Sequence, residues 1–152
     1  MTEGDIAADF TAPTQDGTAL TLSSLRGAPV VLYFYPKDDT PGCTTEARDF
    51  TTLAADFAAR GTMVIGVSKD SVARHGKFVA RHGLAVTLVS DEVGDICETY
   101  GVWGEKRMYG RTYMGITRTT FLIDAAGRIA RIWPKVSVKG HADEVLAAVR
   151  AL

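Results

Sequence analysis

Hydrophobic and polar positions divide the chain into short apolar runs separated by amphipathic stretches. The run Val30–Tyr35 consists of β-branched and aromatic residues, which predicts a strand buried on both faces. The runs Met63–Ser68 and Val86–Ser90 predict two further buried strands. Two later runs, Thr119–Ile123 and Arg128–Trp133, flank a turn sequence Asp-Ala-Ala-Gly and therefore predict a hairpin.

Amphipathic stretches lie between and after these runs. In the first, apolar residues share one helical stripe, at positions Cys43, Ala47, Phe50, Ala54 and Phe57. The stretch Asp70–His82 predicts a second helix that Gly83 ends. A short helix over Val93–Tyr100 and a closing helix over Ala142–Leu152 complete the pattern.

Strands that alternate with helices, followed by a late hairpin, indicate an α/β fold with a central mixed sheet and helices on both faces. The chain has 152 residues, of which 46% are hydrophobic. That length supports one well-packed core but not two, so we expect a single domain over residues 1–152.

Composition and charge exclude several classes of function. A formal net charge of −1 offers no general attraction to nucleic acid or to an anionic membrane. No apolar run approaches the roughly 20 residues that span a bilayer, and the acidic start Met1–Asp5 is unlike a signal peptide. The two cysteines suggest a reducing compartment, so we expect a cytoplasmic protein. The residues Trp103–Tyr113 mix basic and aromatic side chains, and we interpret them as a surface loop.

No cofactor or metal is expected either. His75, His82 and His141 lack the spacing of a metal site, and no glycine-rich nucleotide motif follows a strand. A Cys-x-x-Cys pair, typical of disulfide oxidoreductases, is absent as well.

The segment that follows the first strand carries the clearest chemistry. Pro36 ends the strand, Thr40 is placed as a helix N-cap, and Pro41 occupies the first helical position. Cys43 then falls in the first turn, where unpaired N–H groups and the helix dipole stabilise a thiolate. A structural cysteine that happens to begin a helix is the alternative, and the combined pattern favours a reactive sulfur.

This segment, Pro36-x-x-x-Thr40-x-x-Cys43, resembles the active-site signature of the peroxiredoxins, and its fuller form resembles the bacterioferritin-comigratory, or peroxiredoxin Q, branch. Matching residues cover nearly the whole chain, at Asp9-Phe10, Gln15–Gly17, Leu22–Gly27, Tyr100–Gly104, Tyr113–Ile116 and Arg118–Asp124. The resemblance implies a thioredoxin-like fold with peroxiredoxin additions. It also implies a thiol-dependent peroxidase that reduces hydrogen peroxide and small organic hydroperoxides, in antioxidant defence and cell redox homeostasis.

The resemblance further suggests a role for each site residue. Cys43 would be the peroxidatic nucleophile and would become a sulfenic acid. Thr40 would orient a peroxide oxygen, although it could equally be only a helix cap, and Pro36 would shield the sulfur in addition to ending the strand. Arg118 would favour the thiolate and bind the peroxide, whereas by position alone it would be a solvated arginine. Glu46 is given a positioning role at most.

The second half of the catalytic cycle departs from the branch. Many members carry a resolving cysteine where Arg48 stands here, and others carry one near Val79. Cys97 is the remaining candidate, and a buried inert cysteine is the alternative reading of it. We therefore favour reduction by an external thiol, from thioredoxin, glutaredoxin or a small molecule. A thiol-disulfide exchanger and a non-enzymatic peroxide sensor are the other functions considered, and we expect a monomer or weak dimer.

Overall fold

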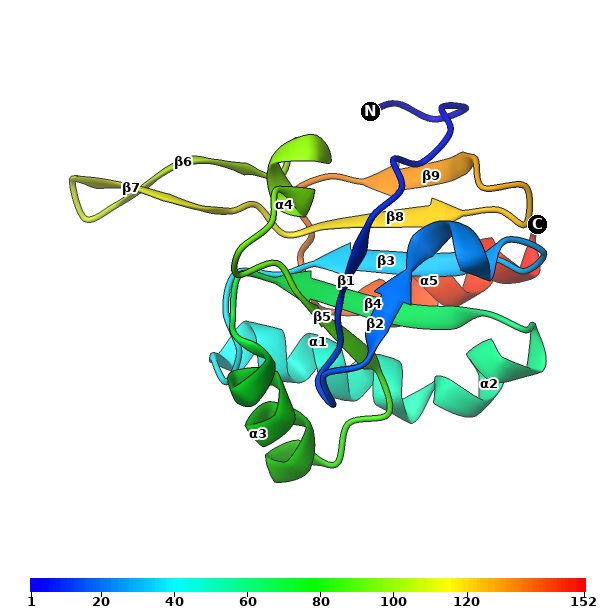
Figure 1. Ribbon diagram of the computed structural model, residues 1–152, viewed down its shortest axis with the longest axis horizontal. Coiled ribbons are helices and arrows are strands. Elements are labelled where there is room, and N and C mark those ends of the chain that lie inside the picture. The colour runs from blue at the N-terminus through cyan, green and yellow to red at the C-terminus, as the bar shows by residue number, and fades with distance from the viewer.

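The computed structural model describes all 152 residues and is built around a five-stranded sheet (Figure 1). The strands are β3 (Val30–Phe34), β4 (Met63–Ser68), β5 (Thr87–Ser90), β8 (Thr119–Ile123) and β9 (Ile129–Trp133). Their order across the sheet is β5-β4-β3-β8-β9. Strands β3, β4 and β5 run parallel, β8 pairs antiparallel with β3, and β9 pairs antiparallel with β8. The predicted central mixed sheet is therefore confirmed.

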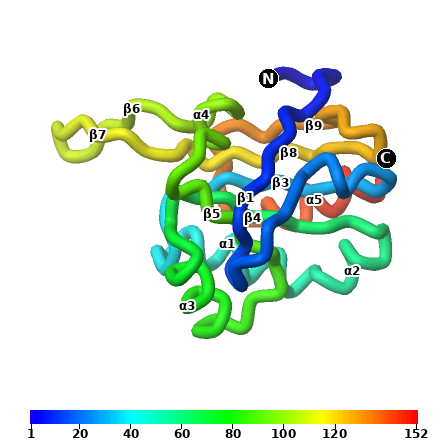
Figure 2. The backbone as a smooth tube through the Cα atoms, in the orientation of Figure 1, coloured from blue at the N-terminus to red at the C-terminus, as the bar shows by residue number.

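Two layers cover this sheet. One face carries the four helices α1 (Pro41–Thr52), α2 (Ala54–Ala59), α3 (Val72–His82) and α5 (His141–Arg150). The opposite face carries the N-terminal segment, with β1 (Thr11–Pro13), β2 (Ala19–Thr21) and the 3-10 helix η1 (Leu22–Leu25), together with α4 (Ile96–Thr99). The chain path in Figure 2 shows the N-terminal segment crossing in front of the sheet. None of the helices is both long and apolar enough to pass through a membrane.

Side chains that alternate along β3 contribute to two separate hydrophobic cores. Tyr33 and Tyr35 point to the helical face and share its core with Cys43. Leu32 and Phe34 point to the other face and share its core with Cys97. Cys43 belongs to α1 and Cys97 to α4, and these helices cover opposite faces, so the two cysteines lie on opposite sides of the sheet.

The register between β3 and β8 brings together the segments that matter for chemistry. Phe34, the last residue of β3, pairs with Thr119, the first residue of β8. Since these strands are antiparallel, Arg118 lies at the same edge of the sheet as the loop that leads from β3 into α1. Its backbone carbonyl accepts a hydrogen bond of 2.8 Å from the Val136 N–H, which anchors this end of β8.

Several predicted elements differ in detail from the structure. The predicted helix through Phe57 is two helices, with a break at Leu53. Just before the break, the hydroxyls of Thr51 and Thr52 donate to the carbonyls of Ala47 and Arg48, a back-bonding pattern that bends helices. The helix predicted from residue 70 begins only at Val72, because the Ser71 side chain caps it.

Two further expectations are wrong. The helix predicted over residues 93–100 is only the single turn of α4, and Val93 is 95% exposed instead of packing beside Cys97. The predicted surface loop over residues 103–113 belongs to a two-stranded ribbon, β6 (Trp103–Met108) and β7 (Arg111–Ile116). Figure 1 shows this ribbon extending away from the sheet.

Candidate active site

Cys43 lies in the first turn of α1, as its sequence context predicts. Thr40 has the extended backbone of an N-cap residue, at φ −89° and ψ 154°, and Pro41 begins the helix. The hydroxyl of Thr40 does not cap the helix and instead donates to the Lys37 carbonyl at 2.8 Å. Its oxygen lone pairs are thereby left to accept a hydrogen bond. Cys43 itself is 2% exposed, so its sulfur is sheltered from bulk water.

Arg118 brings a positive charge to this sulfur. Its Nη2 lies 3.3 Å from the Cys43 Sγ, and its Nη1 donates to the Glu46 Oε1 at 2.6 Å. Burial opposes the charged guanidinium, but Glu46 and Cys43 together raise the pKa of Arg118. The three side chains therefore form one contact chain, from carboxyl to guanidinium to sulfur.

Gly42 makes room for this guanidinium. A Cβ built on Gly42 would stand 3.2 Å from the Arg118 Nη2, which is tighter than ordinary van der Waals contact. This role of Gly42 was not predicted from the sequence. Its position immediately before the cysteine could have drawn attention to it. The need for a residue without a side chain, however, depends on Arg118, which lies far away in the sequence, just before β8.

Glu46 is the most deeply buried carboxyl of the site. The residue is 1% exposed, and its Oε2 has no hydrogen-bond partner. Burial raises the pKa of Glu46 to about 7, although Arg118 acts in the opposite direction. Near neutral pH this side chain is consequently divided between its ionised form, which offsets the charge of Arg118, and its neutral form, which does not.

Pro36 lies in the loop after β3 and is half-buried. It lines an open groove of about 390 Å³ together with Lys37, Trp103 and Ile116, among other residues. This groove runs between the base of the β6–β7 ribbon and the loop that joins β3 to α1, residues 35–40, which we call the cysteine loop. Pro36 therefore forms part of the wall of this groove, at the point where the cysteine loop begins.

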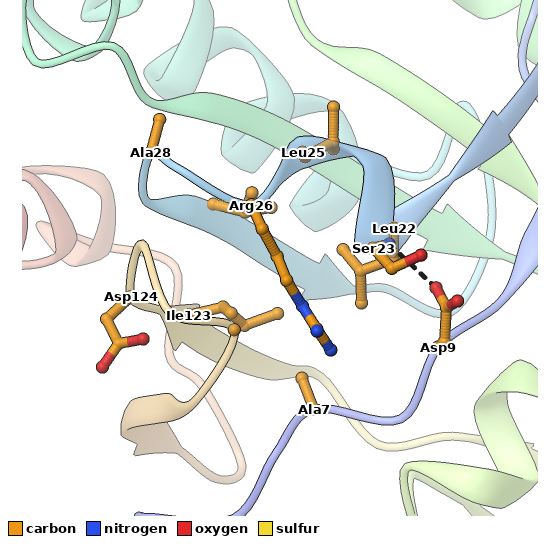
Figure 3. Close-up of a pocket in the computed structure, with 11 residues that line it drawn as sticks. Ala7, Asp9, Leu22, Ser23, Leu25, Arg26, Ala28, Ile123 and Asp124 are labelled. Atoms are coloured by element: carbon orange, nitrogen blue, oxygen red, sulfur yellow. Dashed lines mark hydrogen bonds between the residues drawn. The ribbon is translucent and has the colours of Figure 1, made fainter.

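A second hollow lies at the other end of β3 (Figure 3). Its lining includes Val30 and Ile123, which pair with each other where β3 begins, whereas Cys43 follows the end of that strand. Its volume is about 10 Å³, roughly what one water needs, so it does not accommodate a substrate. Figure 3 shows the Arg26 side chain crossing it.

Cys97 occupies the opposite core and is fully buried. Both cysteines are free thiols. The Asp91 carboxylate accepts hydrogen bonds from the backbone N–H groups of Ile96 and Cys97, at 3.1 and 2.9 Å. Burial and the nearby Asp91 raise the pKa of the Cys97 thiol well above its usual range.

One buried group of side chains has the composition of a metal site. Ligand atoms of Asp38, Asp70 and His75 lie within 4.8 Å of one another. Hydrogen bonds already use these atoms: His75 Nδ1 lies 2.6 Å from the Asp38 Oδ2, and Asp70 Oδ2 accepts from the Asp38 N–H at 2.8 Å. No local sequence motif marks this cluster, because Asp38 follows β3, Asp70 follows β4 and His75 lies in α3.

Comparison with known proteins now identifies the class. Residues 4–132 match the AhpC/TSA family, which is most of the chain. The chain therefore belongs to this family of thiol peroxidases, and it is an oxidoreductase.

The relatives place it within one branch. A putative peroxiredoxin of the bacterioferritin-comigratory type from Coxiella burnetii is 50% identical over 143 residues, covering 94% of this chain and 95% of its own. A cysteine-to-serine mutant of Xylella fastidiosa PrxQ superposes with a TM-score of 0.94 at 41% identity, covering 99% of this chain and 96% of that one. The Xanthomonas campestris bacterioferritin comigratory protein superposes with a TM-score of 0.88 at 46% identity, covering 93% and 90%. The chain is thus a member of the bacterioferritin-comigratory, or peroxiredoxin Q, branch, and the predicted family and thioredoxin-like fold are confirmed.

Proposed function

We propose that this thiol peroxidase reduces hydrogen peroxide and small organic hydroperoxides through a sulfenic acid on Cys43. The observation that carries the proposal is the 3.3 Å contact between Arg118 Nη2 and the Cys43 Sγ. A guanidinium at that distance favours a thiolate and offers further N–H donors to a bound oxygen. The related Xanthomonas campestris protein is described in terms of alkyl peroxide reduction, which supports organic hydroperoxides as substrates.

The chemical step needs groups of this chain, the peroxide and a proton from water. The Cys43 thiolate attacks the terminal oxygen of the hydroperoxide, a sulfur–oxygen bond forms, and the oxygen–oxygen bond breaks. The leaving alkoxide or hydroxide takes a proton from water, and sulfur is oxidised by two electrons to the sulfenic acid. Arg118 stabilises the charge that moves onto the leaving oxygen.

Thr40 and Pro36 complete the proposed site. Because the Thr40 hydroxyl hydrogen is engaged by the Lys37 carbonyl, its oxygen is oriented to accept a hydrogen bond from the peroxide O–H. Pro36 has no N–H and shields the entry to the loop from water. Glu46 holds Arg118 in place through its 2.6 Å contact and touches no reacting atom.

For the reducing half of the cycle, we propose an external thiol. It attacks the sulfenic sulfur and releases water, and a second thiol then breaks the mixed disulfide. Cys97 is a poor partner for Cys43, because it belongs to the core on the other side of the sheet and Asp91 disfavours its thiolate. The donor would be thioredoxin, glutaredoxin or a small thiol, and the presence of two free thiols accords with a reducing, cytoplasmic setting.

Peptide mass spectrometry after one equivalent of hydrogen peroxide, with a sulfenic-acid trap present, tests the proposal. We expect a trapped adduct on Cys43 and an unmodified Cys97, with multiple turnovers when a thiol reductant is added. A Cys43–Cys97 disulfide would contradict the external-thiol step. A persistent sulfenic acid that no thiol reduces would favour a peroxide sensor over the enzyme.

A further inference from the structure

A second polar cluster is buried beside the cysteine loop. Its three members are Tyr35, the first residue after β3, Asp38 in the loop and His75 in α3, and each is at most 3% exposed. The Tyr35 hydroxyl donates to the Asp38 Oδ1 at 2.5 Å, and His75 Nδ1 lies 2.6 Å from the Asp38 Oδ2. Both carboxyl oxygens of Asp38 are therefore hydrogen-bonded, in a setting shielded from solvent by burial.

The far side of the His75 ring is engaged as well. Its Nε2 lies 3.0 Å from the backbone carbonyl of Val89 in β5. A carbonyl only accepts, so Nε2 carries a hydrogen and donates it. The ring thus connects the central sheet to the loop, with a strand on one side and Asp38 on the other.

The backbone of the loop is held at the same point. The Asp38 N–H donates to the Asp70 Oδ2 at 2.8 Å, and this oxygen also accepts from the Ser68 hydroxyl at 2.6 Å. The next residue, Asp39, adopts φ 63°, a left-handed conformation that is uncommon for a residue with a side chain. Its carboxylate is bound by His82 at 2.8 Å and by Arg81 at 3.2 Å, both from α3.

A short series of contacts leads from this cluster to the reacting sulfur. Asp38 follows Lys37, whose carbonyl receives the Thr40 hydroxyl. The Thr40 carbonyl in turn accepts the Thr44 N–H at 2.9 Å, which closes the helical turn that contains Cys43. A shift of Asp38 would therefore move the Lys37 carbonyl, the Thr40 oxygen and this turn together.

We propose that Tyr35, Asp38 and His75 are positioning residues of the peroxidase, which hold the cysteine loop so that Thr40 and Cys43 face the same bound peroxide. The inference rests on the proposed function for the identity of the reacting group. None of the three forms a hydrogen bond with the Cys43 sulfur. They act by tying the loop to α3 and β5.

Tyr35→Phe and Asp38→Asn test this proposal. The first removes one hydroxyl and keeps the ring, and the second keeps the shape of the side chain and removes its charge. We expect the second-order rate constant for hydrogen peroxide to fall about tenfold in Asp38→Asn and by a smaller factor in Tyr35→Phe. The thiolate absorbance of Cys43 at neutral pH should fall in the same order.

His141→Gln is the matched control. His141 is also buried and hydrogen-bonded, at 2.8 Å to the Thr120 hydroxyl, but it lies in α5 and does not touch the loop. It should lower the urea midpoint and leave both the rate constant and the thiolate absorbance of the folded protein unchanged. Equal rate constants and equal absorbance in wild type, Tyr35→Phe and folded Asp38→Asn would overturn the proposal.

Failure of the proposed peroxidase function can be distinguished from failure of the positioning role. If wild-type protein does not consume peroxide, the proposed function fails, whereas the thiolate absorbance of the variants still measures whether the cluster positions Cys43. If Asp38→Asn does not fold, the comparison of Tyr35→Phe with wild type decides the question alone.

Discussion

The two cysteines of this protein have nearly the same local setting and opposite electrostatic surroundings. Both are buried, and both lie in the first turn of a helix that follows a strand and a loop. At Cys43 the nearest charged group is the Arg118 guanidinium. At Cys97 the Asp91 carboxylate lies at the helix N-terminus and accepts hydrogen bonds from the backbone N–H groups of Ile96 and Cys97. The two cysteines therefore share burial and helix position and differ in the charge beside them.

The sign of the neighbouring charge determines which form of the sulfur is favoured at each cysteine. A cation beside sulfur favours the thiolate, and a carboxylate in an apolar setting favours the neutral thiol. Lys69 pairs with Asp91 at 3.0 Å and neutralises part of its charge, but burial still raises the pKa of the Cys97 thiol. The contrast between an arginine site and an aspartate site can be tested residue by residue.

The largest effect is expected from Cys43→Ser. A hydroxyl does not ionise comparably at neutral pH, so the variant should lose peroxide consumption altogether. The measurement is the rate of peroxide loss with excess thiol reductant. Activity retained at the wild-type level would place the reacting sulfur elsewhere, with Cys97 as the remaining cysteine.

Arg118→Ala should follow, with a loss of about a hundredfold in the rate constant for peroxide. The variant removes the cation beside Cys43 and leaves Glu46 buried without a partner, so its thiolate absorbance at neutral pH should also fall. Arg118→Lys is the matched control, because it keeps the charge and loses the forked donor. A rate constant in Arg118→Ala within twofold of wild type would contradict the role of the guanidinium.

Glu46→Gln should change the pH dependence of stability more than the rate. Burial raises the pKa of Glu46 from 4.5 to about 7, so the neutral carboxyl is favoured in the folded state. Its contribution to stability is fully present below pH 4.5 and is lost as pH rises through about 7. Urea unfolding of both proteins across this range should show Glu46→Gln gaining stability relative to wild type as pH rises. A constant difference would contradict the raised pKa.

The smallest effect is expected from Cys97→Ser. Its turnover with a thiol reductant should equal that of wild type, and its free energy of unfolding should change by about 1 kcal/mol as a small buried side chain is altered. The same assay with thioredoxin and with a small thiol covers both kinds of donor. A loss of turnover with thioredoxin alone would make Cys97 the resolving residue.

Local patterns predicted much of the fold correctly. The apolar runs predicted β3, β4 and β8 to within a residue, since β-branched and aromatic residues favour strands wherever they are packed. The ribbon of β6 and β7 was missed, because its exposed residues, such as Glu105 and Arg107, carry no apolar alternation. The helix predicted from Val93 was too long for a related reason. Val93 has the helical spacing to Cys97, but the residues around it are acidic or glycine, and the helix begins only at Ile96.

Local sequence was enough to predict the geometry around Cys43, because a strand-forming run, two prolines and a helical stripe act within a few residues of one another. The resemblance carried by the motif then identified the family and pointed to Arg118. The charge beside each cysteine and the contacts that hold the cysteine loop depend on residues that are far apart in the chain. Arg118 lies 75 positions from Cys43, and His75 lies 37 positions from Asp38. Such pairs form through the register of β3 with β8 and the packing of α3, which arise from the whole sheet and not from any short segment.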